Sequence, residues 1–155
     1  MGFFDWFAVS KDSRLCAAVR RGDRARVVAL VGEGADPNAR CRGETPLTIA
    51  AAGRDSATAD ILLGLGADPD RAGHGGATAL FVACRQGDID LARVLLEAGA
   101  DPGLGLPDGR TPFVAAKHFR HDAVADLVER YARAEPVGPV FLSWTKRHPR
   151  DNAAI

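Results

Sequence analysis

The amino-acid sequence of 155 residues predicts an all-α solenoid built from four helix-turn-helix repeats. The motif Gly-Ala-Asp-Pro occurs three times, with copies 32 and 33 residues apart, and begins at Gly34, Gly66 and Gly99. A second motif, Gly-x-Thr, keeps a spacing of 33 residues and begins at Gly43, Gly76 and Gly109. Two motifs in fixed phase over three periods indicate a repeat architecture.

The threonine of the second motif predicts the start of a short first helix in each repeat. A threonine hydroxyl at the N-cap can accept a hydrogen bond from a free N–H of the first turn. Pro46 and Pro112 then occupy the first helical position, where no N–H donor is needed. The apolar, Ala-rich residues that follow predict first helices at 47–52, 80–85 and 113–118.

A second helix in each repeat is predicted by apolar residues at helical spacing, such as Leu91, Val94 and Leu95. The glycine of the first motif is expected to end this helix in a left-handed conformation, and Asp-Pro then directs the chain into an extended finger. Asp23, Asp55 and Asp88 fall at the starts of second helices, where a negative charge favours the helix dipole. We expect the second helix of the second repeat to be the least well packed.

This order of helix, turn, helix and finger resembles the ankyrin repeat. The family signature Thr-Pro-Leu-His-x-Ala-Ala is matched from Thr45 to Ala51, with Thr48 in place of histidine, and looser copies begin at Thr78 and Thr111. The resemblance implies β-hairpin-like fingers and non-repeat extensions at both ends. It places an N-terminal extension at 1–10, repeats at about 11–39, 40–72, 73–105 and 106–133, and a C-terminal extension at 134–155.

Charge and cysteine content exclude several classes of protein. The 20 basic and 20 acidic residues give a net charge of zero, which argues against a protein that coats nucleic acid. The three cysteines, Cys16, Cys41 and Cys84, form no CxxC pair, so neither a disulfide framework nor a zinc site is expected. A reducing, cytoplasmic location is therefore predicted, and neither a signal peptide nor a membrane-spanning segment is expected.

The sequence predicts no enzymatic activity, no cofactor and no metal ion. It contains no GxSxG, P-loop or HExxH motif, and no second ligand follows His74 or His118 in helical phase. Cys16 and Cys84 fall on the inward face of first helices, where a cysteine is expected to act as a small apolar filler. His121 falls in a turn and is expected to be structural.

The resemblance implies that finger tips and exposed positions of the first helices line a concave binding surface. Arginines outnumber acids at these positions, and arginine pairs bidentately with carboxylates, so we predict a basic groove that binds an acidic protein surface. An alternative is that the exposed arginines only solubilise the array, and nucleic acid is disfavoured because few aromatic residues are present for base stacking. The predicted partner-binding residues are Arg20, Arg21, Arg42, Glu44, His74, Arg85, Gln86, Asp108, Arg110, His118 and Phe119.

Aromatic residues gather at the N-terminus, namely Phe3, Phe4, Trp6 and Phe7. They are expected to cap the first repeat, because a solenoid must cover the core of its terminal repeats. The alternative is an anchor into a partner groove or a membrane interface, although no Lys or Arg precedes Lys11 to support membrane binding. At the other end, 140–142 and Trp144 are expected to pack on the last repeat.

The predicted function is a non-catalytic protein-binding module that is monomeric when free. The 17 arginines against three lysines, with abundant alanine and glycine, favour a high-GC bacterial genome. The resemblance to small bacterial ankyrin proteins then suggests a companion or inhibitor of one enzyme, as an immunity protein is to its toxin. The alternative function is a peripheral membrane or scaffold adaptor anchored by the aromatic N-terminus.

Overall fold

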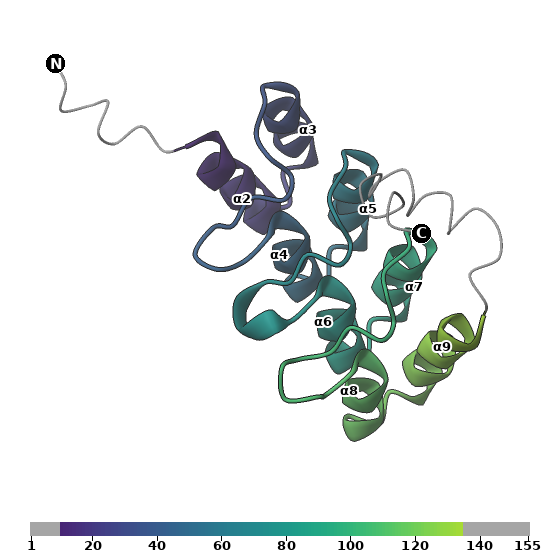
Figure 1. Ribbon diagram of the computed structural model, residues 1–155. Helices are drawn as coiled ribbons and strands as arrows, with labels where there is room; N and C mark the ends of the chain where they lie inside the picture. Colours follow the sequence, from purple (N-terminus) through teal and green to yellow (C-terminus); the bar gives the residue numbers. More distant parts are fainter. Residues whose placement is uncertain (1–9, 135–155) are drawn as a thin grey trace, which may run out of the picture.

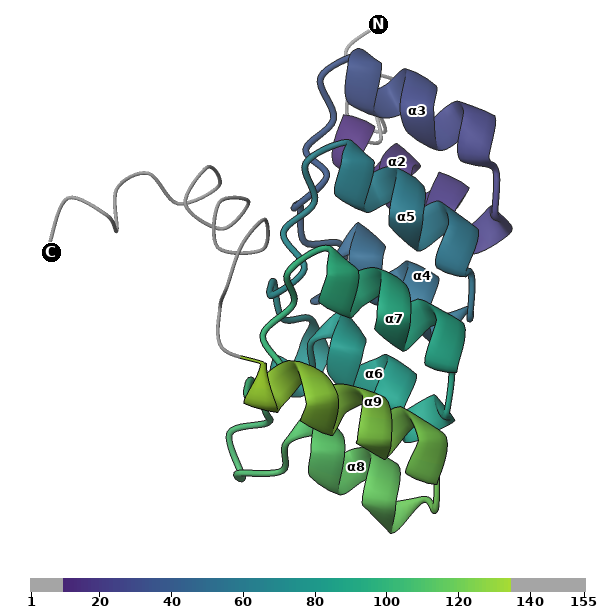
Figure 2. The same cartoon turned by 90° about the vertical axis from the view of Figure 1, so that its right-hand side faces the viewer.

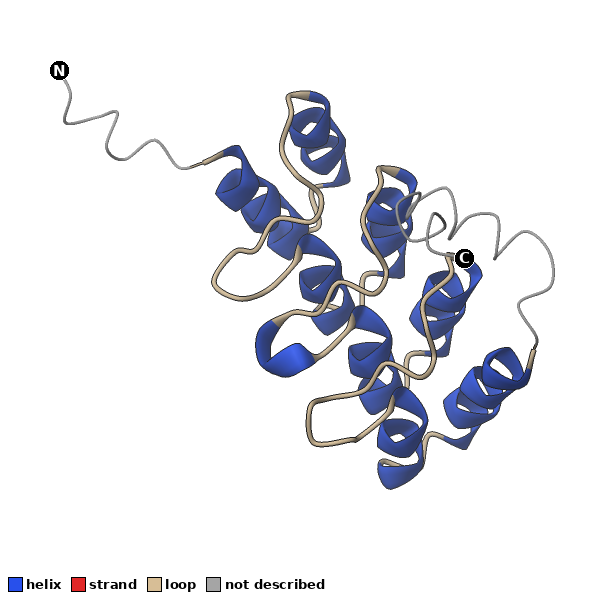
Figure 3. Ribbon diagram, in the orientation of Figure 1, coloured by secondary structure: helices blue, strands red, loops and turns tan. Residues whose placement is uncertain are grey.

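The described residues, 10–134, form two rows of α-helices in a computed structural model of the chain (Figure 1). The first row contains α2 (Lys11–Arg21), α4 (Pro46–Ala52), α6 (Ala79–Gln86) and α8 (Pro112–His118). The second row contains α3 (Arg24–Gly32), α5 (Ser56–Gly64), α7 (Ile89–Glu97) and α9 (Asp122–Arg133), which stack one above another in Figure 2. Finger loops project beside the first row, and no β-strand occurs within 10–134 (Figure 3). The predicted all-α solenoid is confirmed.

Threonine N-caps begin α4, α6 and α8 as predicted, and Ser10 caps α2. The hydroxyl oxygens of Thr45, Thr78 and Thr111 accept hydrogen bonds from backbone N–H groups three residues later, at 3.1, 3.2 and 3.3 Å. Prolines lie in the first turns of α4 and α8, where their missing N–H leaves no helical hydrogen bond unmade. The helices begin within one residue of the predicted positions.

Three of the second-row helices, α3, α5 and α7, are closed at both ends by local hydrogen bonds. The carboxylates of Asp23, Asp55 and Asp88 accept from the N–H three residues later and so act as N-caps. At the other ends, backbone N–H groups after the helix return to the last turn, as in the pair Gly66 N–Leu63 O and Ala67 N–Leu62 O. The glycines of the repeated motif take the left-handed conformation that this geometry requires, and they are Gly34, Gly66 and Gly99.

The turn between the two helices of each repeat also needs a left-handed residue. Gly22 and Gly87 hold this conformation in the first and third repeats, with φ of 68° and 73°. Arg54 and Arg120 hold it in the second and fourth, with φ of 56° and 60°. A side chain with a Cβ atom is strained in this region, so these two arginines cost stability that glycine would not.

The hydrophobic core lies between the two rows and is filled mainly by fully buried leucines. They include Leu15, Leu30, Leu47, Leu62, Leu80 and Leu95. The expectation that the second helix of the second repeat packs least well is wrong, because α5 buries Thr58, Ala59 and Leu62 completely. Only Val27 and Leu30 are buried in α3, which ends its row within the described residues.

Hydrogen bonds within and between repeats hold the bases of the fingers in register. The N–H of Asp36 donates to Asp12 Oδ1 at 2.9 Å, and the N–H of Asp68 donates to Asn38 Oδ1 at 2.7 Å. The N–H of Asp101 donates to Asp70 Oδ1 at 2.7 Å. The first bond ties the start of the first repeat to the base of its finger, and the other two join one repeat to the next, so the bases of successive fingers are fixed relative to one another.

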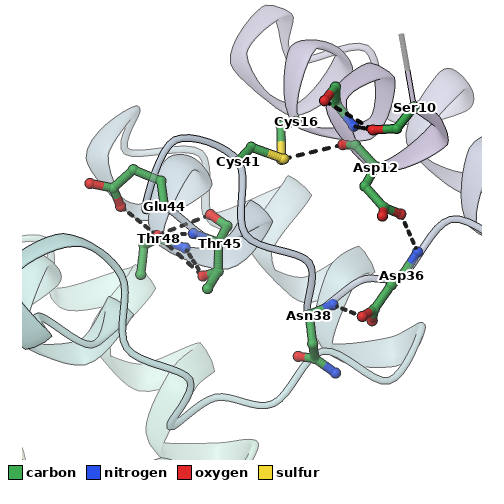
Figure 4. Close-up of a disulfide and its surroundings, with 10 residues drawn as sticks. Ser10, Asp12, Cys16, Asp36, Asn38, Cys41, Glu44, Thr45 and Thr48 are labelled. Carbon is green, nitrogen blue, oxygen red and sulfur yellow. Dashed lines mark hydrogen bonds between the residues drawn. A yellow bond between two sulfur atoms is a disulfide. The ribbon is translucent and has the colours of Figure 1, made fainter. Parts of the chain in front are cut away.

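Cys16 and Cys41 form a disulfide bond (Figure 4). The expectations that no disulfide forms and that Cys16 is an apolar filler are therefore wrong. Cys16 lies on α2 and Cys41 in the first finger, so the bond crosses from one repeat to the next. The prediction of a cytoplasmic location loses the support of cysteine content, because disulfides persist mainly in oxidising compartments. Cys84 is free and fully buried, as expected for a small apolar filler.

The predicted extensions fall almost entirely beyond the described residues. The aromatic residues Phe3, Phe4, Trp6 and Phe7 lie outside 10–134, and so do the apolar strip at 140–142 and Trp144. Their proposed capping and anchoring roles remain predictions.

Candidate partner-binding groove

The first finger presents Arg42 at the tip of a tight two-residue turn. The backbone N–H of Cys41 donates to Glu44 O at 2.8 Å, and the N–H of Glu44 donates to Cys41 O at 3.1 Å. Arg42 and Gly43 between them have φ of 56° and 86°, as a two-residue hairpin turn of this type requires. The disulfide at Cys41 fixes the base of this turn to α2, so the position of Arg42 is restricted.

Glu44 is held at the base of the same finger by the start of α4. Thr48 Oγ1 donates to Glu44 Oε2 at 2.7 Å, while the N–H of Thr45 donates to Thr48 Oγ1 at 2.9 Å (Figure 4). The backbone of Gly73 in the next finger lies so close that an added Cβ would sit 2.6 Å from Glu44 Oε2. Glu44 is therefore partly committed to finger packing.

The second and third fingers present one histidine and one ion pair. His74 is exposed in the short 3-10 turn η1 (His74–Gly76), which the N–H of Gly73 closes by donating to Ala77 O at 2.8 Å. In the third finger Arg110 Nη2 lies 2.6 Å from Asp108 Oδ2. Their hydrogen bond lowers the pKa of Asp108 and raises that of Arg110. Asp108 thus reduces the charge that Arg110 offers to a partner.

The C-terminal ends of the first-row helices contribute two series of equivalent side chains beside the fingers. Positions two residues before each left-handed turn residue are Arg20, Ala52, Arg85 and His118. Positions one residue before it are Arg21, Gly53, Gln86 and Phe119. Because these positions are equivalent in successive repeats, their side chains follow one surface along the array.

Four arginines on this surface are exposed and unpaired within the described part of the chain. Arg20, Arg21, Arg42 and Arg85 make no side-chain hydrogen bond or ion pair to residues 10–134. Other arginines brace the scaffold instead: Arg54 Nη2 donates to Gln86 O at 3.1 Å, and Arg24 Nη2 lies 3.1 Å from Asp55 Oδ1. These four unpaired cations lie where binding was predicted, although Arg14, Arg26, Arg71, Arg120 and Arg130 elsewhere in 10–134 also make no side-chain hydrogen bond or ion pair.

Gln86 joins two neighbouring repeats and leaves one acceptor unused. Its Nε2 donates to Ala52 O at 3.1 Å. Its Oε1 is buried and has no hydrogen-bond partner within 10–134. Gln86 therefore contributes to the packing of α6 on α4 more than to a surface that a partner could reach.

Two hollows interrupt the surface that carries the predicted binding residues, which we call the groove. The N-terminal hollow has a volume of about 530 Å³ and is bordered by Arg20, Arg21, Glu44 and Ala52 among others. The C-terminal hollow has a volume of about 330 Å³ and is lined by Phe81, Arg85, Leu106, Arg110, Val114, Ala115, His118 and Phe119. Sequence reasoning missed Phe81, Leu106 and Val114, although Val114 continues the helical face that includes His118.

The described residues offer no obvious catalytic or metal-binding chemistry. Within 10–134 no group of three or more His, Cys, Asp or Glu side chains could hold a metal ion. Burial raises the pKa of the Cys84 thiol to about 12, so this cysteine is no nucleophile at neutral pH. Every helix among these residues is too short or too polar to span a bilayer.

Comparisons with known proteins agree with this geometry. A family model described as ankyrin repeats (3 copies) matches residues 15–105, which is more than half of the chain. The chain is 45% identical over 62 residues to the mitochondrial disaggregase of Bos taurus and 42% identical over 78 residues to the 2-5A-dependent ribonuclease of Mus musculus. These matches cover 39% and 48% of this chain but only 9% and 10% of the two relatives, so the likeness is confined to a small part of each.

Proposed function

This chain belongs to the ankyrin repeat family, whose repeats serve protein–protein interaction, and from that premise we propose that its groove binds an acidic surface of another protein. The proposed contacts are the residues predicted from the sequence, with Arg20, Arg21, Arg42 and Arg85 as the main cations. The chain itself contributes binding rather than catalysis in this proposal.

The unequal engagement of acidic and basic side chains supports the proposal. Asp23, Asp55 and Asp88 are used as helix caps, and Asp36 and Asp101 accept backbone N–H bonds in finger turns. Arg20, Arg21, Arg42 and Arg85 have no such partners within 10–134, whereas Arg110 is paired with Asp108. A chain with no net charge therefore offers a locally basic surface.

Arginine suits an interface with carboxylates because its planar guanidinium donates two parallel hydrogen bonds and is weakly hydrated. Pairs at an exposed rim contribute only about 0.2 to 1 kcal/mol each, whereas close charge pairs inside an interface reach about 1.5 to 7 kcal/mol. We therefore expect several arginines to act together and binding to weaken as salt rises.

Within this function we propose that the partner is a single enzyme, which the chain accompanies or inhibits as an immunity protein does its toxin. Two features of the sequence support this role. It has many more arginines than lysines, which favours a high-GC bacterial genome, and it contains no catalytic motif. Affinity capture from the native cell extract tests it. An enzyme recovered in stoichiometric amount, with its activity changed by the purified chain, is the expected result.

The capture is best run with three matched forms of the full chain. The groove variant carries Arg42→Glu, Arg85→Glu and Arg110→Glu, and the control variant carries Arg26→Glu, Arg93→Glu and Arg130→Glu on second-row helices. Both variants change the net charge equally. Loss of the partner from the groove variant alone supports the proposal, whereas equal recovery by all three forms contradicts it.

The aromatic N-terminus supports a second candidate function, a peripheral membrane or scaffold adaptor. Phe3, Phe4, Trp6 and Phe7 are dense enough to form an anchor. Deletion of residues 2–8 separates the two roles. Loss of thermal stability indicates a cap on the first repeat, whereas loss of vesicle or partner binding with stability intact indicates an anchor.

A further inference from the structure

Two exposed apolar side chains lie together at the C-terminal end of the groove. Val114 on α8 and Phe119 immediately after it are 46% and 50% exposed, among the few large apolar side chains left accessible within 10–134. Both line the hollow of about 330 Å³, together with Phe81 and Leu106. An apolar cluster inside a depression, rather than scattered over the surface, is typical of an interaction site.

The third and fourth repeats differ from the earlier ones at these positions. The residues equivalent to Phe119 are Arg21, Gly53 and Gln86. Replacement of a polar or small residue by phenylalanine adds apolar surface in the groove that the fold does not require. The equivalent of Val114 in the preceding repeat, Phe81, is buried and forms part of the floor of the hollow.

The Phe119 ring contacts two histidines. His118 meets it edge-on at a centroid distance of 4.9 Å, and His121 lies nearly parallel to it at 6.4 Å. His121 in turn packs on the turn of the third repeat, since an added Cβ on Gly87 would lie 2.5 Å from His121 Nδ1. A ring supported in this way loses little conformational entropy when a partner covers it.

The rim of the hollow is cationic. Its lining residues include the guanidinium groups of Arg85 and Arg110 but no acidic side chain. Asp108 lies just outside and is engaged by Arg110, whereas Arg85 has no ion-pair partner among the described residues. An apolar floor inside a basic rim is complementary to an apolar side chain flanked by carboxylates.

We propose that this hollow, the α6–α8 pocket, receives one leucine or aromatic side chain from an acidic segment of the partner, whose flanking carboxylates pair with Arg85 and Arg110. The inference rests on the proposed function and adds an apolar anchor to the acidic surface. Such an anchor dominates the affinity of many interfaces, while the charged rim sets orientation and salt dependence.

Selection of random peptides displayed on phage against the immobilised full chain tests the pocket. The expected enriched peptides contain one leucine, phenylalanine, tyrosine or tryptophan among several Asp and Glu residues. Phe119→Gln introduces the residue that the preceding repeat has at this position, and it should lower the affinity for a synthetic form of the enriched peptide by at least about tenfold. Val114→Ser is the second variant, and Val28→Ser, at 47% exposed on α3, is the matched control that should leave affinity unchanged.

The outcomes separate the pocket from the wider proposal. Two results contradict the pocket but are compatible with the acid-binding groove. One is that the enriched peptides are acidic but contain no apolar residue. The other is that Arg85→Glu lowers the affinity for the peptide while Phe119→Gln and Val114→Ser do not. The proposed function itself is contradicted if the enriched peptides contain no acidic residues, or if Arg85→Glu also leaves the affinity for the peptide unchanged. A large fall in melting temperature for Phe119→Gln with unchanged peptide affinity shows that the chain fills its own pocket, which also overturns the inference.

Discussion

Cys16 and Cys41 are joined by a disulfide that links α2 to the first finger, with their Cα atoms 6.5 Å apart. The two residues are 25 positions apart in the sequence, so the bond closes a loop that contains the whole of α3. Arg42 follows Cys41 directly. The covalent link therefore stabilises the first repeat and fixes the finger that presents one of the proposed partner contacts.

Cysteine alkylation tests the disulfide by counting accessible thiols. In the native protein the expected count is zero, since Cys84 is fully buried with a raised pKa and the other two cysteines are bonded. Unfolding without reductant should expose one thiol, and unfolding with reductant should expose all three cysteines. Mass spectrometry after alkylation gives the count, and three reactive thiols in the unreduced, unfolded protein would contradict the bond.

Removal of the disulfide should lower the free energy of unfolding by about 3 kcal/mol, because a loop of this length no longer restricts the unfolded chain. The double variant Cys16→Ser, Cys41→Ser and urea unfolding provide the measurement. Wild type in excess reductant should match the variant closely, and the variant should not respond to reductant. If the urea midpoint of the wild type did not change on addition of reductant, the disulfide would not contribute to the free energy of unfolding.

Arg120→Gly should stabilise the protein by about 1 kcal/mol, since it relieves a left-handed backbone at φ 60°. Arg120 donates no side-chain hydrogen bond to residues 10–134, so little is lost with its guanidinium. Arg120→Ala is the matched control, because it removes the same side chain but keeps the Cβ atom. Thermal unfolding should rank glycine above both arginine and alanine, and equal stability of the glycine and alanine forms would refute the role of backbone strain.

Asp55 should make stability depend on acidic pH. Burial opposes its ionisation, but hydrogen bonds from the Thr58 hydroxyl and N–H and from Arg24 outweigh burial and lower the pKa of its carboxyl. A carboxyl with a lowered folded pKa stabilises the fold above the ordinary aspartate pKa of about 3.9, and this stability is lost as pH falls through the folded value.

Asp55→Asn should therefore cost about 0.5 to 1 kcal/mol at pH 7, and the cost should vanish in acid. Urea unfolding at several pH values gives the difference between variant and wild type. Asp60→Asn, at an exposed position of the same helix, is the control and should show no such trend. A difference for Asp55→Asn that stays constant from neutral to acid pH would rule out the ionised cap.

Local chemistry made much of the fold predictable from sequence. Thr45 and Thr78 mark helix starts and Gly66 marks a helix end through hydrogen bonds within a few residues, so their repetition was enough to locate the helices. The disulfide was not predictable in this way, because its partners come from different repeats and only the stacking of α2 against the first finger brings them together.

The candidate site was predictable in outline only. Register along the repeats located Arg20, Arg42 and Arg85 on one surface. It could not show that Asp108 engages Arg110, which depends on the turn at the tip of the third finger, or that Val114 and Phe119 share a hollow, which depends on how that finger lies against α8.

The central claim is that the groove arginines bind an acidic protein surface. Its most direct test is the dissociation constant of the captured partner, measured at increasing salt, for wild type, the Arg42→Glu, Arg85→Glu, Arg110→Glu variant and the Arg26→Glu, Arg93→Glu, Arg130→Glu control. We predict that wild type and control weaken in parallel as salt rises, while the groove variant binds at least about tenfold more weakly at low salt and loses most of the salt dependence. Equal affinity and equal salt dependence of all three forms would contradict the claim.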